Sequence, residues 1–145
     1  MEQVVTALAP QERGIGRPTN TGTAASQVGN TATVELLVGF EGDTHRLTVE
    51  GMKTLRMFAT ALNDPRLQGA RLQIVAHTYL PNAPTSALPV SARRAQSVAD
   101  HLLAFYDIQP AQIAATNGVG AAQINVGNLA DPMNQRIAIT NIGSL

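Results

Sequence analysis

Residues 71–99 contain the side chains best suited to binding chemistry. We interpret this stretch as a buried strand that ends at His77, a Pro-rich uncharged loop, and a helix that begins at Ser91. Arg93 and Arg94 would lie in the first turn of that helix, where free backbone N–H groups and the helix dipole also favour an anion. No Asp or Glu lies between Asp64 and Asp100, so we expect a cationic site without a carboxylate partner.

The same survey predicts no catalytic, metal or cofactor site. The three histidines, His45, His77 and His101, are scattered, and cysteine is absent. No nucleophile elbow, paired carboxylates or metal-ligand spacing is present, and the glycines at 118 and 120 lack the rest of a dinucleotide motif. We therefore expect a protein that is not an enzyme, with His77 as a structural histidine satisfied by loop backbone and Arg93 as a solvated helix residue.

Composition excludes several classes of partner. The chain has 145 residues, and its ten acidic and ten basic side chains balance. A surface for duplex nucleic acid would need a clustered basic excess, and three Phe, two Tyr and no Trp offer few stacking platforms. No apolar run approaches the ~20 residues of a membrane-spanning helix. No signal peptide is visible, so the chain is expected either to be intracellular or to begin after a removed leader.

The elements that must position these residues form one domain after a tail. Residues 1–30 are rich in Gly, Thr, Ser, Ala and Asn and are predicted to be a flexible tail or linker, and residues 31–145 the domain. Hydrophobic periodicity predicts strands at 31–40, 71–77, 113–117 and 136–142 and helices at 47–64 and 91–106. The inward stripes are expected to be Met52, Leu55, Phe58, Ala59 and Leu62 in the first helix and Ala95, Val98, Ala99 and Leu102 in the second. Strands that alternate with helices predict an α/β fold whose helices cover one sheet face.

Five short motifs, in order, resemble the OmpA-like C-terminal domain family. They are Phe40 with Leu47, residues 76–79 (Ala-His-Thr-Tyr), 90–95 (Val-Ser-Ala-Arg-Arg-Ala), 118–120 (Gly-Val-Gly) and 134–137 (Asn-Gln-Arg-Ile). The resemblance covers about residues 37–142. It implies an OmpA-like βαβαβ-β two-layer sandwich with a mixed sheet.

The resemblance also implies a function and a set of ligand-binding residues. Members of the family bind the diaminopimelate of the peptidoglycan stem peptide, which presents an ammonium beside a carboxylate. Arg94 matches the family's ligand-binding arginine, but Tyr79 stands where the family has an aspartate, and Gln135 replaces the first of two arginines. The implied ligand-binding positions are His77, Thr78, Tyr79, Ser91, Arg94 and Asn134.

The anionic half of this implied site is therefore missing. We expect Tyr79 to pack against the Pro-rich loop, and its hydroxyl would be a neutral acceptor. Asn134 is expected to tie the site together through hydrogen bonds to backbone. Asp131 is the one acid that could approach from another loop. Loss of a charge-assisted hydrogen bond worth ~1.5–3 kcal/mol would weaken diaminopimelate binding by one to two orders of magnitude.

Two hypotheses follow. The favoured one is a non-catalytic module of the periplasm or cell envelope of a bacterium that associates with peptidoglycan, with weakened or altered recognition. The alternative is a protein-protein interaction or structural module that keeps the fold but no longer binds peptidoglycan. In that case the apolar segment from Leu80 to Val90 would contact an envelope protein.

Overall fold

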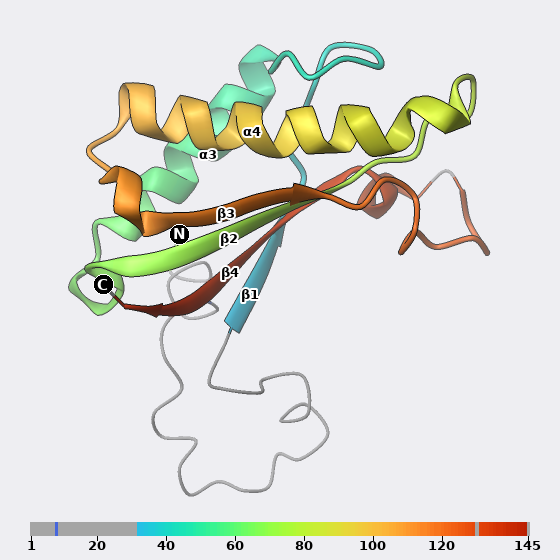
Figure 1. Cartoon of the computed structure of the whole chain (residues 1–145). Coiled ribbons are helices and arrows are strands. Elements are labelled where there is room, and N and C mark those ends of the chain that lie inside the picture. Colours follow the sequence, from blue (N-terminus) through green and yellow to red (C-terminus); the bar gives the residue numbers. More distant parts are fainter. Residues whose placement is uncertain (1–7, 9–31, 130, 145) are drawn as a thin grey trace, which may run out of the picture.

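Two helices cover one face of a four-stranded sheet (Figure 1). The structure is a computed structural model that describes Leu8, residues 32–129 and residues 131–144. The elements carry the labels of Figure 1 and follow the order β1 (Ala32–Leu36), α3 (Val49–Leu62), β2 (Ala70–His77), α4 (Ala87–Phe105), β3 (Ile113–Gly118) and β4 (Arg136–Ser144). The predicted two-layer α/β architecture is confirmed.

The sheet is mixed, with strand order β1-β4-β2-β3. The strands β2 and β3 are parallel and are connected through α4, whereas β4 runs antiparallel to both β1 and β2. Alternate residues of β2 face the helices, and Leu72, Ile74 and Ala76 are fully buried there. Because side chains alternate along a strand, the His77 side chain lies on the opposite face of the sheet, away from the helices.

Helix α3 begins at an N-cap, since the Thr48 side chain accepts a hydrogen bond from the backbone N–H of Gly51 at 2.9 Å. Leu55, Phe58 and Ala59 are buried, as predicted. Met52 is 41% exposed, so its predicted place in the core is wrong. The reason is a glycine contact: Gly51 lies so close to Gly39 that a Cβ on Gly51 would be 2.3 Å from the Gly39 carbonyl oxygen, and this approach turns Met52 outward.

Helix α4 begins four residues before the predicted start, at Ala87 rather than Ser91. The prediction placed Pro89 in the loop before the helix. Proline is tolerated in the first turn of a helix, because its missing N–H would have no intrahelical partner there. The predicted inward stripe is confirmed, since Ala95, Val98, Ala99 and Leu102 are all at most 1% exposed.

The first and last strands also differ from their predicted bounds. The strand predicted at 31–40 ends at Leu36, and Phe40 instead forms an isolated antiparallel bridge with Leu47. The last strand extends to Ser144. Neither α3 nor α4 has the length and apolarity needed to cross a bilayer, and the same holds for the rest of the described chain.

Most of the predicted tail lies outside the described residues, with Leu8 as the exception. Leu8 is fully buried within the core cluster. Its carbonyl accepts a hydrogen bond from the Asn141 side chain of β4 at 2.7 Å. At this one position, therefore, the N-terminal segment packs against the domain.

Candidate ligand-binding site

Arg94 is held inside the domain and does not project into solvent. It is 4% exposed, and its guanidinium donates three hydrogen bonds to neutral acceptors. Nε donates to the carbonyl of Thr44 at 2.8 Å, Nη1 to Oε1 of Gln135 at 3.0 Å, and Nη2 to the carbonyl of Gly42 at 3.1 Å. A guanidinium has five N–H groups, so two are left for a further acceptor.

The acid that acts on Arg94, Asp43, does so through its charge and not through an ion pair. No ion pair joins Arg94 to a carboxylate within the part of the chain that the structure describes. Its guanidinium lies over the ring of Phe40, 4.7 Å from the centroid, which adds a cation–π contact. Burial lowers the pKa of Arg94, and the charge of Asp43 partly offsets this effect. The site is therefore a buried cation whose three hydrogen-bond acceptors are neutral, with the charge of Asp43 acting on it without a direct ion pair.

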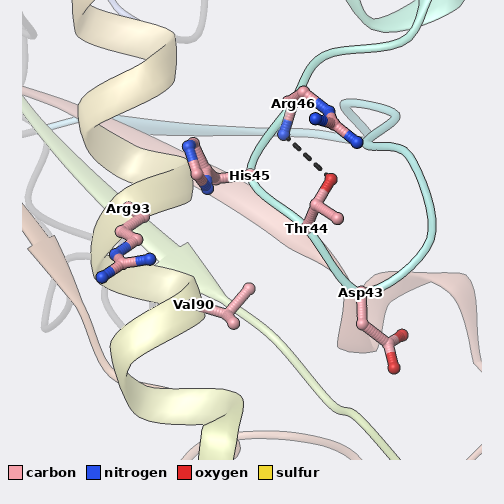
Figure 2. Close-up of a pocket in the computed structure, with 6 residues that line it drawn as sticks. All are labelled: Asp43, Thr44, His45, Arg46, Val90 and Arg93. Carbon is pink, nitrogen blue, oxygen red and sulfur yellow. Dashed lines mark hydrogen bonds between the residues drawn. The ribbon is translucent and has the colours of Figure 1, made fainter.

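Arg94 clamps a tight turn at residues 41–46. Within the turn, the Glu41 N–H donates to the Arg46 carbonyl at 2.8 Å. The Thr44 hydroxyl donates to the Glu41 carbonyl at 2.6 Å and accepts from the Arg46 N–H at 3.1 Å; Figure 2 marks the second bond with a dashed line. Together with the two bonds from Arg94, these contacts fix the shape of the turn.

Gln135 connects Arg94 to the end of β2. Its side-chain oxygen accepts from Arg94, and its Nε2 donates to the carbonyl of Tyr79. Tyr79 is half-buried. An amide suits this position, because it can accept from Arg94 on one side and donate to the chain on the other.

Ser91 and Thr78 both lie beside the glycine turn after β3. The Ser91 hydroxyl donates to the Leu88 carbonyl at 2.8 Å and accepts from the N–H of Gly120 at 2.9 Å. Ser91 therefore lies inside α4 and not at its predicted start, and its buried hydroxyl is engaged within the fold. The N–H of Thr78 donates to the Gly120 carbonyl at 3.0 Å.

The prediction that the N-terminus of α4 contributes to the Arg94 site is wrong. Arg94 is the eighth residue of α4, about two turns from its first residue. Dipole effects fall off within the first turn. The attraction for an anion at this position therefore comes from the guanidinium itself.

His77 is 5% exposed, and its Nδ1 has no hydrogen-bond partner within the described chain. The expectation that loop backbone satisfies this histidine is thus wrong for Nδ1. Burial, followed by the charge of Arg136, lowers its pKa, whereas Glu35 raises it. Glu35 itself pairs with Arg136 at 3.2 Å. The Thr78 hydroxyl is likewise buried without a partner in the described residues.

Asn134 organises a separate loop that ends next to Gln135. Its amide oxygen accepts from the Asn125 N–H at 2.7 Å, and its nitrogen donates to the carbonyls of Asn128 and Leu129, both at 3.1 Å. Asp131 does not reach Arg94: its carboxylate accepts from the Met133 N–H at 3.0 Å and the Asn125 amide at 3.3 Å. These bonds lower the pKa of Asp131.

Five of the six predicted positions, all except His77, therefore fall into three groups. Arg94 and Tyr79 meet through Gln135, Thr78 and Ser91 meet at Gly120, and Asn134 supports the adjoining loop. Sequence reasoning missed the carbonyls of Gly42 and Thr44, which are about fifty residues from Arg94 in sequence. The Gly42-Asp43 pair after an apolar strand was a turn signal, but nothing in it indicates which side chain the turn encloses.

Comparisons with known proteins agree with this fold. The sequence profile of the OmpA family matches residues 39–137. The OmpA-like domain of FopA1 from Francisella tularensis subsp. tularensis SCHU S4 superposes with a TM-score of 0.58 at 22% identity, over 76% of this chain and 71% of that one. No curated protein sequence matches the chain.

Two further solved structures share the fold. The periplasmic domain of MotB from Helicobacter pylori superposes with a TM-score of 0.62 at 17% identity, over 76% of this chain and 81% of that chain. The cell wall anchor of the T6SS from Pseudomonas aeruginosa gives a TM-score of 0.58 at 21% identity, over 77% and 80%.

Proposed function

This chain belongs to the OmpA family, and from that premise we propose that it is a non-catalytic module that associates with peptidoglycan in the periplasm or cell envelope of a bacterium. One structural neighbour is described as a cell wall anchor and another as a periplasmic domain, and both descriptions support this compartment and partner. The part of peptidoglycan that it would contact is the stem peptide.

The buried guanidinium of Arg94 is the observation that carries the proposal. A charge removed from water is costly unless it gains a partner of opposite sign. Arg94 donates to three neutral acceptors, and its other two N–H groups have no acceptor among the described residues. A ligand carboxylate would supply the missing partner. The clamped turn at 41–46 would hold this cation in place before the ligand arrives.

Recognition of diaminopimelate is altered, because the ammonium of the ligand meets no carboxylate. Tyr79 occupies the family's aspartate position, and its carbonyl is already an acceptor for Gln135. Asp131 is engaged within its own loop. The ammonium would be left with neutral oxygens, so the stem peptide would be held mainly through its carboxylates.

Retention on isolated sacculi tests the proposal. The full chain should co-sediment with sacculi, and Arg94→Gln should reduce retention about tenfold, since it removes a charge-assisted hydrogen bond. Arg56→Gln, an exposed arginine on α3, is the matched control and should change nothing. Equal retention of wild type and Arg94→Gln, with both variants folded by circular dichroism, would contradict the proposal.

A module that binds a protein partner is the second candidate, and exposed apolar side chains favour it. Leu88 is 58% exposed on the first turn of α4, and Val126 and Leu129 are 79% and 46% exposed on the loop before Asn134. Leu80, which the sequence placed on such a surface, is only 2% exposed and belongs to the interior. No retention on sacculi, together with an envelope partner that is lost in Leu88→Ser, would favour this candidate.

A further inference from the structure

A hollow lies on the outer side of the clamped turn, between that turn and α4 (Figure 2). Its volume is about 320 Å³, and it is lined by Asp43, Thr44, His45, Arg46, Val90 and Arg93. We refer to these six residues as the α4 hollow. Arg94 and Tyr79 do not line it, so it adjoins the site described above and shares only the turn with it.

The two arginines of the α4 hollow differ in whether they have a partner among the described residues. Arg46 pairs with Glu41 at 3.4 Å. Arg93 is exposed, and it has neither an ion pair nor a side-chain hydrogen bond within the described residues. In Figure 2 the His45 ring points toward α4 on the side where Arg93 lies, whereas the carboxylate of Asp43 points away from the helix. The Arg93 guanidinium and the His45 ring can therefore both offer N–H donors to this hollow.

The shape of the hollow is fixed by the bonds that hold the turn. His45 lies between Thr44, whose carbonyl accepts from Arg94, and Arg46, whose N–H donates to the Thr44 hydroxyl. Arg93 and Arg94 are consecutive in α4 but face different ways: Arg94 holds the turn from inside, and Arg93 remains available outside. Such a fixed turn reduces the ordering cost of binding.

We propose that the α4 hollow binds a carboxylate that carries a small apolar neighbour, as found at the C-terminus of a short peptide. Arg93 would bind the carboxylate through its planar fork, His45 would donate a further hydrogen bond, and Val90 would contact the apolar side chain. The volume is at the lower end of the range for ligand pockets, about 300–1,000 Å³, and suits one or two residues. The identification of this peptide as part of the cell wall rests on the proposed function.

The test compares two probes that differ only in charge. Labelled full-length protein is titrated with N-acetyl-Ala-Ala and with its C-terminal amide, and backbone amide shifts are followed by NMR. The free acid should shift the resonances of residues 43–46 and 90–93, and the amide should bind at least about tenfold more weakly, because it lacks the charge-assisted hydrogen bonds.

The variant Arg93→Gln should weaken binding of the acid by a similar factor, while Arg56→Gln, an equally exposed helix arginine, should bind like wild type. Equal binding of acid and amide, no shift at these residues, or unchanged binding by Arg93→Gln would overturn the assignment. Failure here with full retention on sacculi would leave the proposed function in place. Dipeptide binding without retention on sacculi would contradict the proposed function alone.

Discussion

At the scale of single residues, two adjacent arginines have different roles. Arg94 is buried and makes three hydrogen bonds to the turn and to Gln135, whereas Arg93 is exposed. From the sequence, Arg94 could be placed in a helix, but its burial could not be predicted. Whether a side chain enters the fold depends on what covers it, and here the cover is a turn distant in sequence.

Arg94→Ala should therefore lower the free energy of unfolding by about 2 kcal/mol or more, because it removes three part-buried hydrogen bonds donated by a charged group. Urea denaturation monitored by circular dichroism measures the change. Arg93→Ala, one residue away, should stay within about 0.5 kcal/mol of wild type, as expected for an exposed side chain. Similar losses in both variants would contradict the structural role of Arg94.

His77 should make stability depend on pH. Its pKa in the folded protein is lowered below the ordinary value of 6.5, chiefly by burial. The unfolded chain therefore binds a proton at a pH where the folded chain does not, so the free energy of unfolding should fall as the pH drops below 6.5. Above this window His77 is neutral in both states and contributes no slope.

The variant His77→Gln should reduce that slope, as measured by denaturation at several pH values between about 7 and 5, on either side of the ordinary histidine pKa. Burial also lowers the pKa of His101, so a smaller slope should remain and should be reduced further in a His77→Gln, His101→Gln double variant. An unchanged slope in His77→Gln would show that its protonation is not linked to folding.

At the scale of elements, the position of α4 depends on its approach to the end of β3. A Cβ added to Gly118 would lie 2.1 Å from the backbone nitrogen of Ala92 and 2.4 Å from the Ser91 hydroxyl oxygen. The Ser91 hydroxyl bonds to Gly120 at the same place. The glycines of this turn therefore let the helix lie directly against the strand.

Gly118→Ala should destabilise the protein by about 1–3 kcal/mol, since the helix backbone must move to relieve the contact. Gly127→Ala is the matched control: its Cβ would meet only the Asn125 side-chain oxygen, at 3.4 Å. Thermal unfolding of the two variants should separate them clearly. Equal midpoints for the two would refute the close packing of α4 on β3.

Most helices and strands could be predicted from the spacing of hydrophobic residues. The errors in helix bounds and in buried residues have physical causes. The inward stripe of α4 was identified because small and branched apolar residues recur at helical spacing. Its start was missed because Pro89 was interpreted as part of a loop. Met52 was misplaced because Gly51 of α3 lies against Gly39 in the segment between β1 and α3, and this long-range contact orients the helix.

At the scale of the whole molecule, local pattern and resemblance were sufficient to predict the two-layer fold, but not the site. The site is assembled from the turn at 41–46, the end of β2, α4 and the residue before β4. Its hydrogen bonds join residues 41 to 56 positions apart. Such contacts follow from tertiary packing, and no local sequence pattern encodes them.

The central claim is that this fold presents a fixed cation to the wall peptide but no carboxylate for the ligand's ammonium. Introducing a carboxylate tests that claim, because binding of the peptide should become tighter. Gln135 links the backbone of residue 79 to the Arg94 guanidinium, so position 79 is where the carboxylate is introduced. Tyr79→Phe, which removes only the hydroxyl, is the matched control.

The decisive measurement is a calorimetric titration of wild type, Tyr79→Asp and Tyr79→Phe with a diaminopimelate-containing stem peptide. The account predicts that Tyr79→Asp binds roughly 10- to 100-fold more tightly than wild type, as a new charge-assisted hydrogen bond of about 1.5–3 kcal/mol would give. Tyr79→Phe, which adds no charge, should gain no affinity. Equal or weaker binding by Tyr79→Asp, with the variant folded, would contradict the account.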